Sequence, residues 1–274
     1  MWPFDAWRPT EVLRLGRERV ERWQWRGRGL SMIGEAALDG AMDPRALSDA
    51  IVRVFESGGP DVTATATATA PRRVDVVVES AWMPAMCLRT QGLRRTMPAL
   101  ESRLRERFAA NFGDDGDPVA RWALRIDGLP FRECVMGYAW SPSADEALRR
   151  ALEVAGVVPA SVQPALSWAR GLPALRALAR HRGWWLWPEQ DRLLAVGLDR
   201  GTVVAFNPSV PRVDGLLAAP VLSARENARA EVDLGGDVVA SAWREAPRLG
   251  DGMRWLGPVV EAGGGRARQE GAAS

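Results

Sequence analysis

The sequence has no lysine but contains 36 arginines. This absence excludes enzymes that depend on a lysine side chain: P-loop nucleotidases, Schiff-base enzymes and protein kinases. Histidine occurs once, at His181, and cysteine twice, at Cys87 and Cys134. These residues are too widely spaced for a zinc motif, and no nucleophile motif accompanies His181, so neither a zinc site nor a catalytic triad is predicted.

Long apolar runs are also missing. No uninterrupted apolar stretch approaches the ~20 residues of a transmembrane helix, and residues 1–5 lack the features of a signal peptide. The chain of 274 residues is 47% hydrophobic and 26% charged, which is typical of a globular protein long enough for two lobes. We therefore expect a cytoplasmic protein with no membrane span, in which both cysteines are buried and reduced.

Two groups of three short strands are predicted, one in each half of the chain. Turns containing glycine or proline separate the strands within each group. The second group repeats the spacing of the first, which predicts an internal duplication. The strands are expected at Glu11–Leu15, Val20–Trp25 and Leu30–Gly34, and at Gly183–Trp187, Leu193–Leu198 and Thr202–Phe206.

Residues 73–170 alternate strand, helix, two strands and helix. The first helix, ending at Phe112, has an apolar stripe that should lie on a small sheet. The second helix has a capping box formed by Ser143 and Glu146, and Gly156 suits a left-handed C-cap. The stripe consists of Leu93, Met97, Leu100, Leu104 and Phe108. The strands are expected at Val74–Val78, Met83–Arg89, Trp122–Asp127 and Arg132–Trp140.

This order of elements, best matched over Val74–Ala169, resembles the type IV pilus assembly protein PilM and the cytoplasmic domain of the type II secretion protein GspL. Both families belong to the actin-like superfamily. The resemblance implies a two-lobed α/β fold of the duplicated, ribonuclease H-like kind, with a small α+β subdomain inserted into lobe one. The expected boundaries are 1–160 for lobe one, about 83–128 for the subdomain, 161–262 for lobe two and 263–274 for a disordered tail.

The chain departs from the family where nucleotide would bind. Nucleotide-binding members have an acidic residue followed by small residues in the turn after the first strand of each lobe, where main-chain N–H groups hold phosphate. Here the turns are Leu15–Arg19 and Trp187–Asp191; the second contains Pro188, which has no N–H group, and bulky neighbours. We therefore expect no cofactor, no catalytic residue and no metal site, and thus a protein that is not an enzyme.

The resemblance implies a non-catalytic scaffold or adaptor of a type IV pilus or type II secretion inner-membrane platform. Such a protein lies at the inner membrane through a partner and binds a short cytoplasmic segment of a single-span membrane protein; an assembly ATPase is a further candidate partner. In this chain the expected partner-binding residues are Trp82, Met83, Met86 and Leu88, on an extended segment suited to strand addition. The alternative is a nucleotide-binding actin-like ATPase or a sugar-kinase-like enzyme.

Other unusual features have structural explanations. The 13 tryptophans are expected mainly in the core, although an exposed tryptophan can anchor a protein contact. The arginines within 94–107 alternate with Glu101 and Glu106, which favours a solvated helix face over a nucleic-acid site. The acidic residues of 114–117 indicate a solvated turn, since they lack the calcium-loop pattern. His181 is expected at the C-terminal end of a helix, 172–182, where a cation is favoured.

Overall fold

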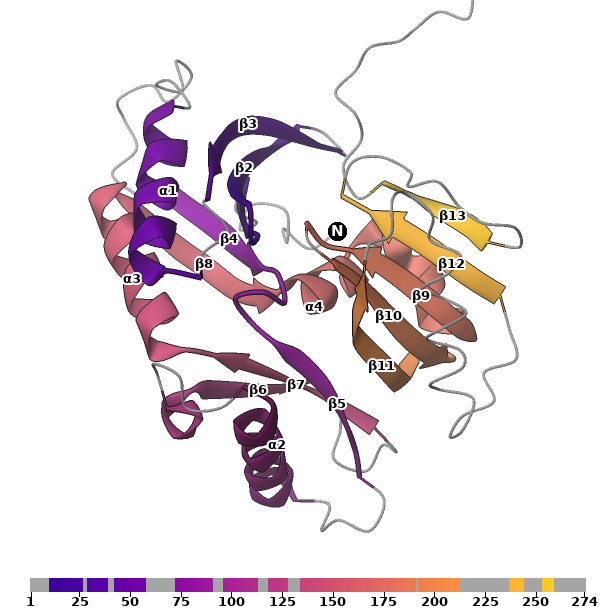
Figure 1. Ribbon diagram of the computed structural model, residues 1–274. Helices are drawn as coiled ribbons and strands as arrows, with labels where there is room; N and C mark the ends of the chain where they lie inside the picture. Colours follow the sequence, from indigo (N-terminus) through magenta and orange to yellow (C-terminus); the bar gives the residue numbers. More distant parts are fainter. Residues whose placement is uncertain are drawn as a thin grey trace, which may run out of the picture.

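The computed structural model describes residues 10–26, 29–38, 42–57, 72–90, 96–112, 118–127, 134–190, 192–211, 237–243 and 253–258. These residues form two five-stranded sheets and one three-stranded sheet, which lie side by side in Figure 1 with helices between and around them. Residues 63–70, 221–232 and the predicted tail 263–274 lie outside the described residues. Within them, no helix is long and apolar enough to cross a membrane.

The first sheet has the order β3-β2-β1-β4-β8. β1, β2 and β3 are an antiparallel meander, whereas β4 and β8 are parallel to β1 and to each other. The strands are β1 (Glu11–Leu15), β2 (Arg19–Arg26), β3 (Gly29–Ala37), β4 (Arg72–Val78) and β8 (Val157–Pro164). β8 crosses the predicted lobe boundary between residues 160 and 161, and that division of the chain stays a prediction.

The second sheet repeats this topology strand for strand. Its order is β11-β10-β9-β12-β13, again with an antiparallel meander followed by two parallel strands. The predicted internal duplication is therefore confirmed. The strands are β9 (Gly183–Pro188), β10 (Arg192–Asp199), β11 (Thr202–Pro211), β12 (Asp237–Ala242) and β13 (Met253–Pro258).

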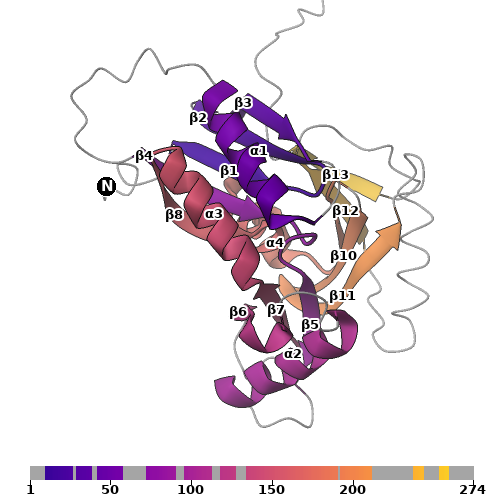
Figure 2. The ribbon, with the colours of Figure 1, turned by 60° about the vertical axis from the view of Figure 1, so that its left-hand side comes forward.

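Two helices, α1 (Pro44–Ser57) and α3 (Pro142–Val154), pack against each other beside the first sheet (Figure 2). The apolar face of α1 points into the core: Leu47 and Ile51 are fully buried and Phe55 packs at the edge of the core. The predicted cap of α3 is wrong. Ser141, not Ser143, is the N-cap, and its hydroxyl accepts a hydrogen bond from the N–H group of Ala144 at 3.2 Å. At the other end of the helix, Gly156 has the predicted left-handed conformation, with φ of 65°.

The inserted subdomain is a small sheet of order β5-β7-β6 covered by α2. Of the predicted stripe, Leu100, Leu104 and Phe108 are fully buried on this sheet, but Met97 in the first turn of α2 is 45% exposed; Leu93 lies outside the described residues. α2 approaches β7 so closely that a Cβ atom on Gly137 would lie 2.5 Å from Leu104 Cδ2. The elements are β5 (Ala85–Arg89), α2 (Met97–Phe112), η2 (Val119–Arg121), β6 (Ala123–Asp127) and β7 (Cys134–Trp140).

Two short helices, α4 (Ala165–Arg170) and η3 (Pro173–Arg180), connect the first sheet to the second. The segment predicted as a helix over 172–182 is a 3₁₀ helix, and the buried His181 is its C-cap. One hydrophobic core runs through this connection, because residues of both five-stranded sheets, such as Val12, Val76, Leu194 and Val239, belong to a single buried cluster.

Candidate functional site

The two turns that would hold phosphate in a nucleotide-binding relative contact each other directly. Gln190, in the turn between β9 and β10, extends its side chain to the turn between β1 and β2. Its Oε1 accepts hydrogen bonds from the N–H groups of Glu18 at 2.7 Å and Arg19 at 3.0 Å, and its Nε2 donates to the carbonyl of Arg19 at 3.2 Å. The amide side chain of the second lobe thus engages two main-chain donors of the first.

Gly16 makes this contact possible. A Cβ atom at this position would lie 2.2 Å from Cδ of Gln190, well inside van der Waals contact. Trp82 closes the other side of the same turn, where its Nε1 donates to the carbonyl of Gly16 at 2.8 Å. The turn between β1 and β2 is therefore enclosed by side chains of this chain.

Two buried carboxylates lie at the same junction. Glu79 directly follows β4 and accepts a hydrogen bond from the N–H group of Gln190 at 3.2 Å. Glu189 accepts from the N–H group of Ser80 at 2.9 and 3.0 Å, and also from the Ser80 hydroxyl. Burial, together with the nearby charge of Glu79, raises the pKa of Glu189 to about 8. Glu189 is therefore mostly protonated at neutral pH.

Arg14 of β1 is the cation of this junction. It donates to Glu21 at 2.9 Å and to Glu79, and all three side chains are buried. Burial alone would lower the pKa of Arg14, but the charges of Glu79 and Glu21 outweigh it and raise the pKa. Burial raises the pKa of Glu79, against the opposing effect of Arg14. Because arginine keeps its proton, Arg14 supplies the fixed charge around which the carboxylates are arranged.

A cluster of tryptophans fills the space beside this ion pair. Trp243, which follows β12, stacks on Trp168 of α4 with ring centroids 4.9 Å apart and planes 9° apart. Its ring centroid is 6.2 Å from that of Trp23 in β2 and 6.2 Å from that of Trp187 in β9. The Arg14 guanidinium lies 4.6 Å from the Trp243 ring centroid, within range of a cation–π interaction. Trp243 therefore joins side chains of both five-stranded sheets.

The tryptophans of β9 and β2 follow the prediction of core packing. Trp185 and Trp187 face the main core, and Trp184, on the opposite face of β9, belongs to a second buried cluster. All three are at most 3% exposed. Trp23 is buried and Trp25 packs against the same core, as their shared strand face predicts.

The four predicted partner-binding residues lie at the start of the subdomain. Trp82 and Met83 precede β5, which begins at Ala85, and both belong to the main core. Leu88 belongs to the core of the subdomain, and Met86 packs half-buried against that core. The structure therefore divides these residues between two neighbouring cores, and their role in partner binding stays a prediction.

Both cysteines are free thiols, Cys134 buried and Cys87 half-buried. The Cys134 thiol donates to the carbonyl of Val204 at 3.3 Å, which links the subdomain to β11. A hydrogen bond with Cys134, together with burial, raises the pKa of the Cys87 thiol, which keeps it protonated. No cluster of metal-ligating side chains occurs within the described ranges.

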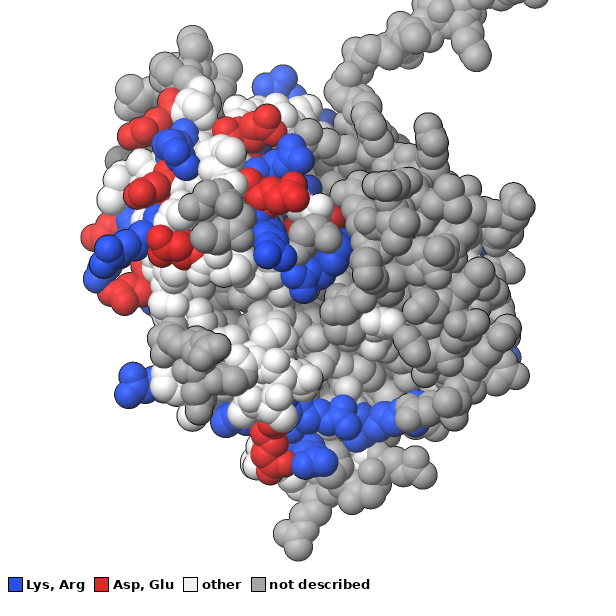
Figure 3. Space-filling view, in the orientation of Figure 1, with Lys and Arg blue, Asp and Glu red and all other residues white. Residues whose placement is uncertain are grey.

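The charged surface of α2 agrees with a solvated helix face. Arg103 pairs with Glu106 at 2.7 Å, and Arg105 pairs with Glu101 at 3.1 Å. In Figure 3, acidic and basic side chains are interspersed around α1 at the upper left, and basic side chains gather along the lower edge, where α2 and β5 lie. Arg94 and Arg95 lie outside the described residues.

Solved structures show what kind of fold this is. A protein of unknown function from Bacteroides thetaiotaomicron, described as having an actin-like ATPase fold, is 12% identical over 90% of this chain and 86% of its own, with a TM-score of 0.54. The fold of this chain is actin-like. A chain of the PilM–PilN type IV pilus biogenesis complex is 16% identical over 86% of this chain and 81% of its own, with a TM-score of 0.50.

A third similar structure is the cytoplasmic domain of EpsL, an inner-membrane component of the type II secretion system of Vibrio cholerae. It is 13% identical over 90% of this chain and 88% of its own, with a TM-score of 0.44. The sequence matches no protein-family model and no curated protein. The predicted fold class, a two-lobed actin-like fold with an inserted subdomain, is confirmed.

Sequence reasoning assigned no role to the residues of the junction, such as Arg14, Gln190 and Trp243. The sequence marked the turn at 187–191 as too bulky for phosphate, but it gave no sign that Gln190 would contact the opposite lobe. Trp243 follows β12 and stacks on Trp168. The high tryptophan content of the chain is the one sequence feature that could have pointed to Trp243.

Proposed function

We propose that this protein is a non-catalytic cytoplasmic scaffold of a type IV pilus or type II secretion inner-membrane platform. In this proposal it binds a short cytoplasmic segment of a single-span inner-membrane protein and is held at the membrane by that partner. An assembly ATPase is a second candidate partner. The likeness in fold to a chain of the PilM–PilN complex is what suggests this class of partner.

The contact made by Gln190 is the observation that carries the non-catalytic part of the proposal. Phosphate binding in a turn needs free main-chain N–H groups. The N–H groups of Glu18 and Arg19 already donate to the side-chain amide of Gln190. Phosphate could reach these N–H groups only if both hydrogen bonds were broken. The tryptophan cluster around Trp243 also fills part of the space between the two sheets. Both features favour a protein that does not hold triphosphate.

Calorimetric titration of the full chain with ATP and Mg²⁺ tests this part. We expect no binding heat in the micromolar range. The Gln190→Ala variant, which releases the N–H groups of Glu18 and Arg19, serves as a comparison, and Gln24→Ala on β2 is a control away from the junction. Micromolar ATP binding by the unaltered protein would refute the proposal and support the alternative, a nucleotide-binding ATPase or sugar-kinase-like enzyme.

The partner segment is proposed to bind along β5, with Trp82, Met83, Met86 and Leu88 shaping the site. β5 is an edge strand, because β7 is its only hydrogen-bonded neighbour in the described sheet. An edge strand can accept an additional strand from a peptide, although here a peptide would have to displace Arg107, which donates to the Cys87 carbonyl at 3.4 Å. Met86 is only half-buried, so it is the member of the set best able to contact a bound segment.

A pull-down with the cytoplasmic segment of a candidate single-span inner-membrane protein tests the site. Met86→Ala and Trp82→Ala should weaken capture, whereas Met97→Ala should not, because Met97 is exposed on α2. Thermal unfolding of each variant separates loss of the site from loss of the fold. Equal capture by folded Met86→Ala, Trp82→Ala and Met97→Ala proteins would refute this placement.

A further inference from the structure

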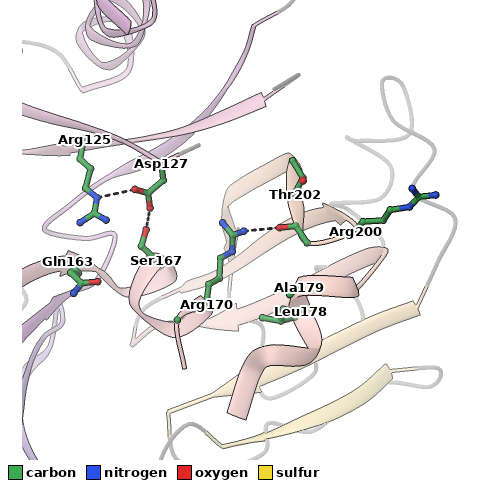
Figure 4. A pocket seen from close by; sticks show the side chains of 11 residues that line it. Arg125, Asp127, Gln163, Ser167, Arg170, Leu178, Ala179, Arg200 and Thr202 are labelled. Carbon is green, nitrogen blue, oxygen red and sulfur yellow. Dashed lines mark hydrogen bonds and ion pairs between the residues drawn. The ribbon is translucent and has the colours of Figure 1, made fainter. Parts of the chain in front are cut away.

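A polar pocket of about 440 Å³ opens where the inserted subdomain meets the second sheet. β6, the end of β8, α4, η3 and the turn between β10 and β11 all contribute to its wall. Figure 4 shows Arg125, Asp127 and Ser167 on one side of the open space, and Arg170 and Thr202 on the other. The pocket is distinct from the junction of Gln190 and from the proposed partner site on β5.

The side chains on the first side hold one another in place. Arg125 Nε donates to Asp127 at 3.0 Å, and the Ser167 hydroxyl donates to the same carboxylate. The negative charge of Asp127, the one acidic residue of the lining, is therefore compensated within the wall. An anion that enters the pocket therefore faces the Arg125–Asp127 ion pair on this wall, and the charge of Asp127 does not repel it strongly.

Arg170 supplies the charge on the second side. It is exposed at the end of α4, and its guanidinium donates to the carbonyl of Gly201 at 2.7 Å. That bond orients the group but leaves its charge uncompensated, since Arg170 has no carboxylate partner among the described residues. Arg200 adds positive charge to the same turn, although its guanidinium points away from Arg170 in Figure 4. The lining thus has three arginines and one aspartate.

The position of Arg170 is fixed by local structure. Arg200 and Gly201 both have positive φ, 48° and 75°, as the tight turn between β10 and β11 requires. A Cβ atom on Gly201 would lie 2.5 Å from the carbonyl oxygen of Ala179, so the turn is seated closely on η3. The carbonyl that orients Arg170 is therefore held by the fold, and the donors around the cavity are organised before a ligand arrives.

We propose that this pocket binds a small oxyanion, a phosphate or carboxylate group, with Arg170 as its main charged contact. A guanidinium offers a planar fork of N–H donors that matches either group in two parallel hydrogen bonds. The Thr202 hydroxyl offers a further donor on the wall. Because the wall combines the subdomain, α4 and the second sheet, a bound anion links all three. The proposal does not depend on the proposed function.

Calorimetry of the full chain with inorganic phosphate and, separately, with succinate tests the proposal at constant ionic strength. We expect at least one of them to bind with Kd of about 0.1–1 mM, as suits a ligand of few atoms. Binding of phosphate alone identifies a phosphate site, and binding of succinate alone identifies a carboxylate site. Arg170→Gln should weaken binding by about tenfold or more, because it removes a charged donor.

Two further variants make the result specific. Arg149→Gln removes an exposed arginine of α3 that pairs with Asp145, and binding should stay at the level of the unaltered protein. Thr202→Val keeps the shape of the side chain and should weaken binding by a smaller factor than Arg170→Gln. Absence of heat for both anions at about tenfold above the expected Kd would overturn the proposal. So would equal binding by folded Arg170→Gln and Arg149→Gln proteins, which indicates general attraction to a basic surface.

Discussion

Glu189 should make the stability of this protein fall as the pH rises. Its pKa is about 8 in the folded protein, against an ordinary 4.5, so the folded state keeps a proton that the unfolded state loses. Stability from this group is complete below about pH 4.5 and is lost progressively up to about pH 8. One pKa unit corresponds to about 1.36 kcal/mol, so the whole loss amounts to about 5 kcal/mol.

The Glu189→Gln variant isolates this effect. A glutamine side chain resembles the protonated carboxyl group: its oxygen can accept from the Ser80 N–H group as Glu189 does, and it carries no charge. We expect urea unfolding of the variant, followed by tryptophan fluorescence, to give a free energy that falls clearly less between pH 5 and 8 than that of the unaltered protein. The unaltered protein should lose several kcal/mol over that range, so the variant becomes the more stable protein at alkaline pH.

Glu101→Gln is the matched control, because Glu101 is exposed on α2 and pairs with Arg105 at the surface. Its pH dependence should equal that of the unaltered protein. The reasoning about Glu189 is refuted if Glu189→Gln keeps the same fall in stability between pH 5 and 8. A fall of that size would then have to originate in other groups.

Three further substitutions test the packing. Trp243→Ala should lower the free energy of unfolding by about 3–5 kcal/mol, because it leaves a cavity at the centre of the tryptophan cluster. A loss below about 1 kcal/mol in urea unfolding would contradict a central packing role for Trp243. Gly137→Val should cost about 1–3 kcal/mol, because its side chain overlaps Leu104; an unchanged melting temperature would argue against the close approach. Ser141→Ala should cost about 1 kcal/mol in thermal unfolding, and Ser143→Ala much less, since Ser141 is the N-cap. A larger loss for Ser143→Ala than for Ser141→Ala would instead support Ser143 as the N-cap.

The fold was largely predictable because its signals are local. Alternating apolar residues and turn residues mark the two meanders, and their equal spacing predicted the duplication. The cap of α3 was misassigned because two serines compete within three positions. Pro142 decides between them, since proline is favoured at the first position of a helix and Ser141 directly precedes it.

The junction was not predictable because its contacts join distant parts of the chain. Gln190 and Glu18 are 172 positions apart, and neither residue type is unusual in a turn. The same is true of the pocket, where Asp127 and Ser167 meet across 40 positions. Contacts of this kind depend on how the two sheets pack, and periodicity along one strand or helix carries no information about that.

The cluster of Trp23, Trp168, Trp187 and Trp243 has a mechanical consequence. To swing the two sheets apart, the protein would have to hydrate these rings, at about 4–6 kcal/mol for each fully buried tryptophan. That penalty is comparable to the entire stability of many domains. We therefore expect a hinge motion that separates the two sheets to be strongly disfavoured in this protein.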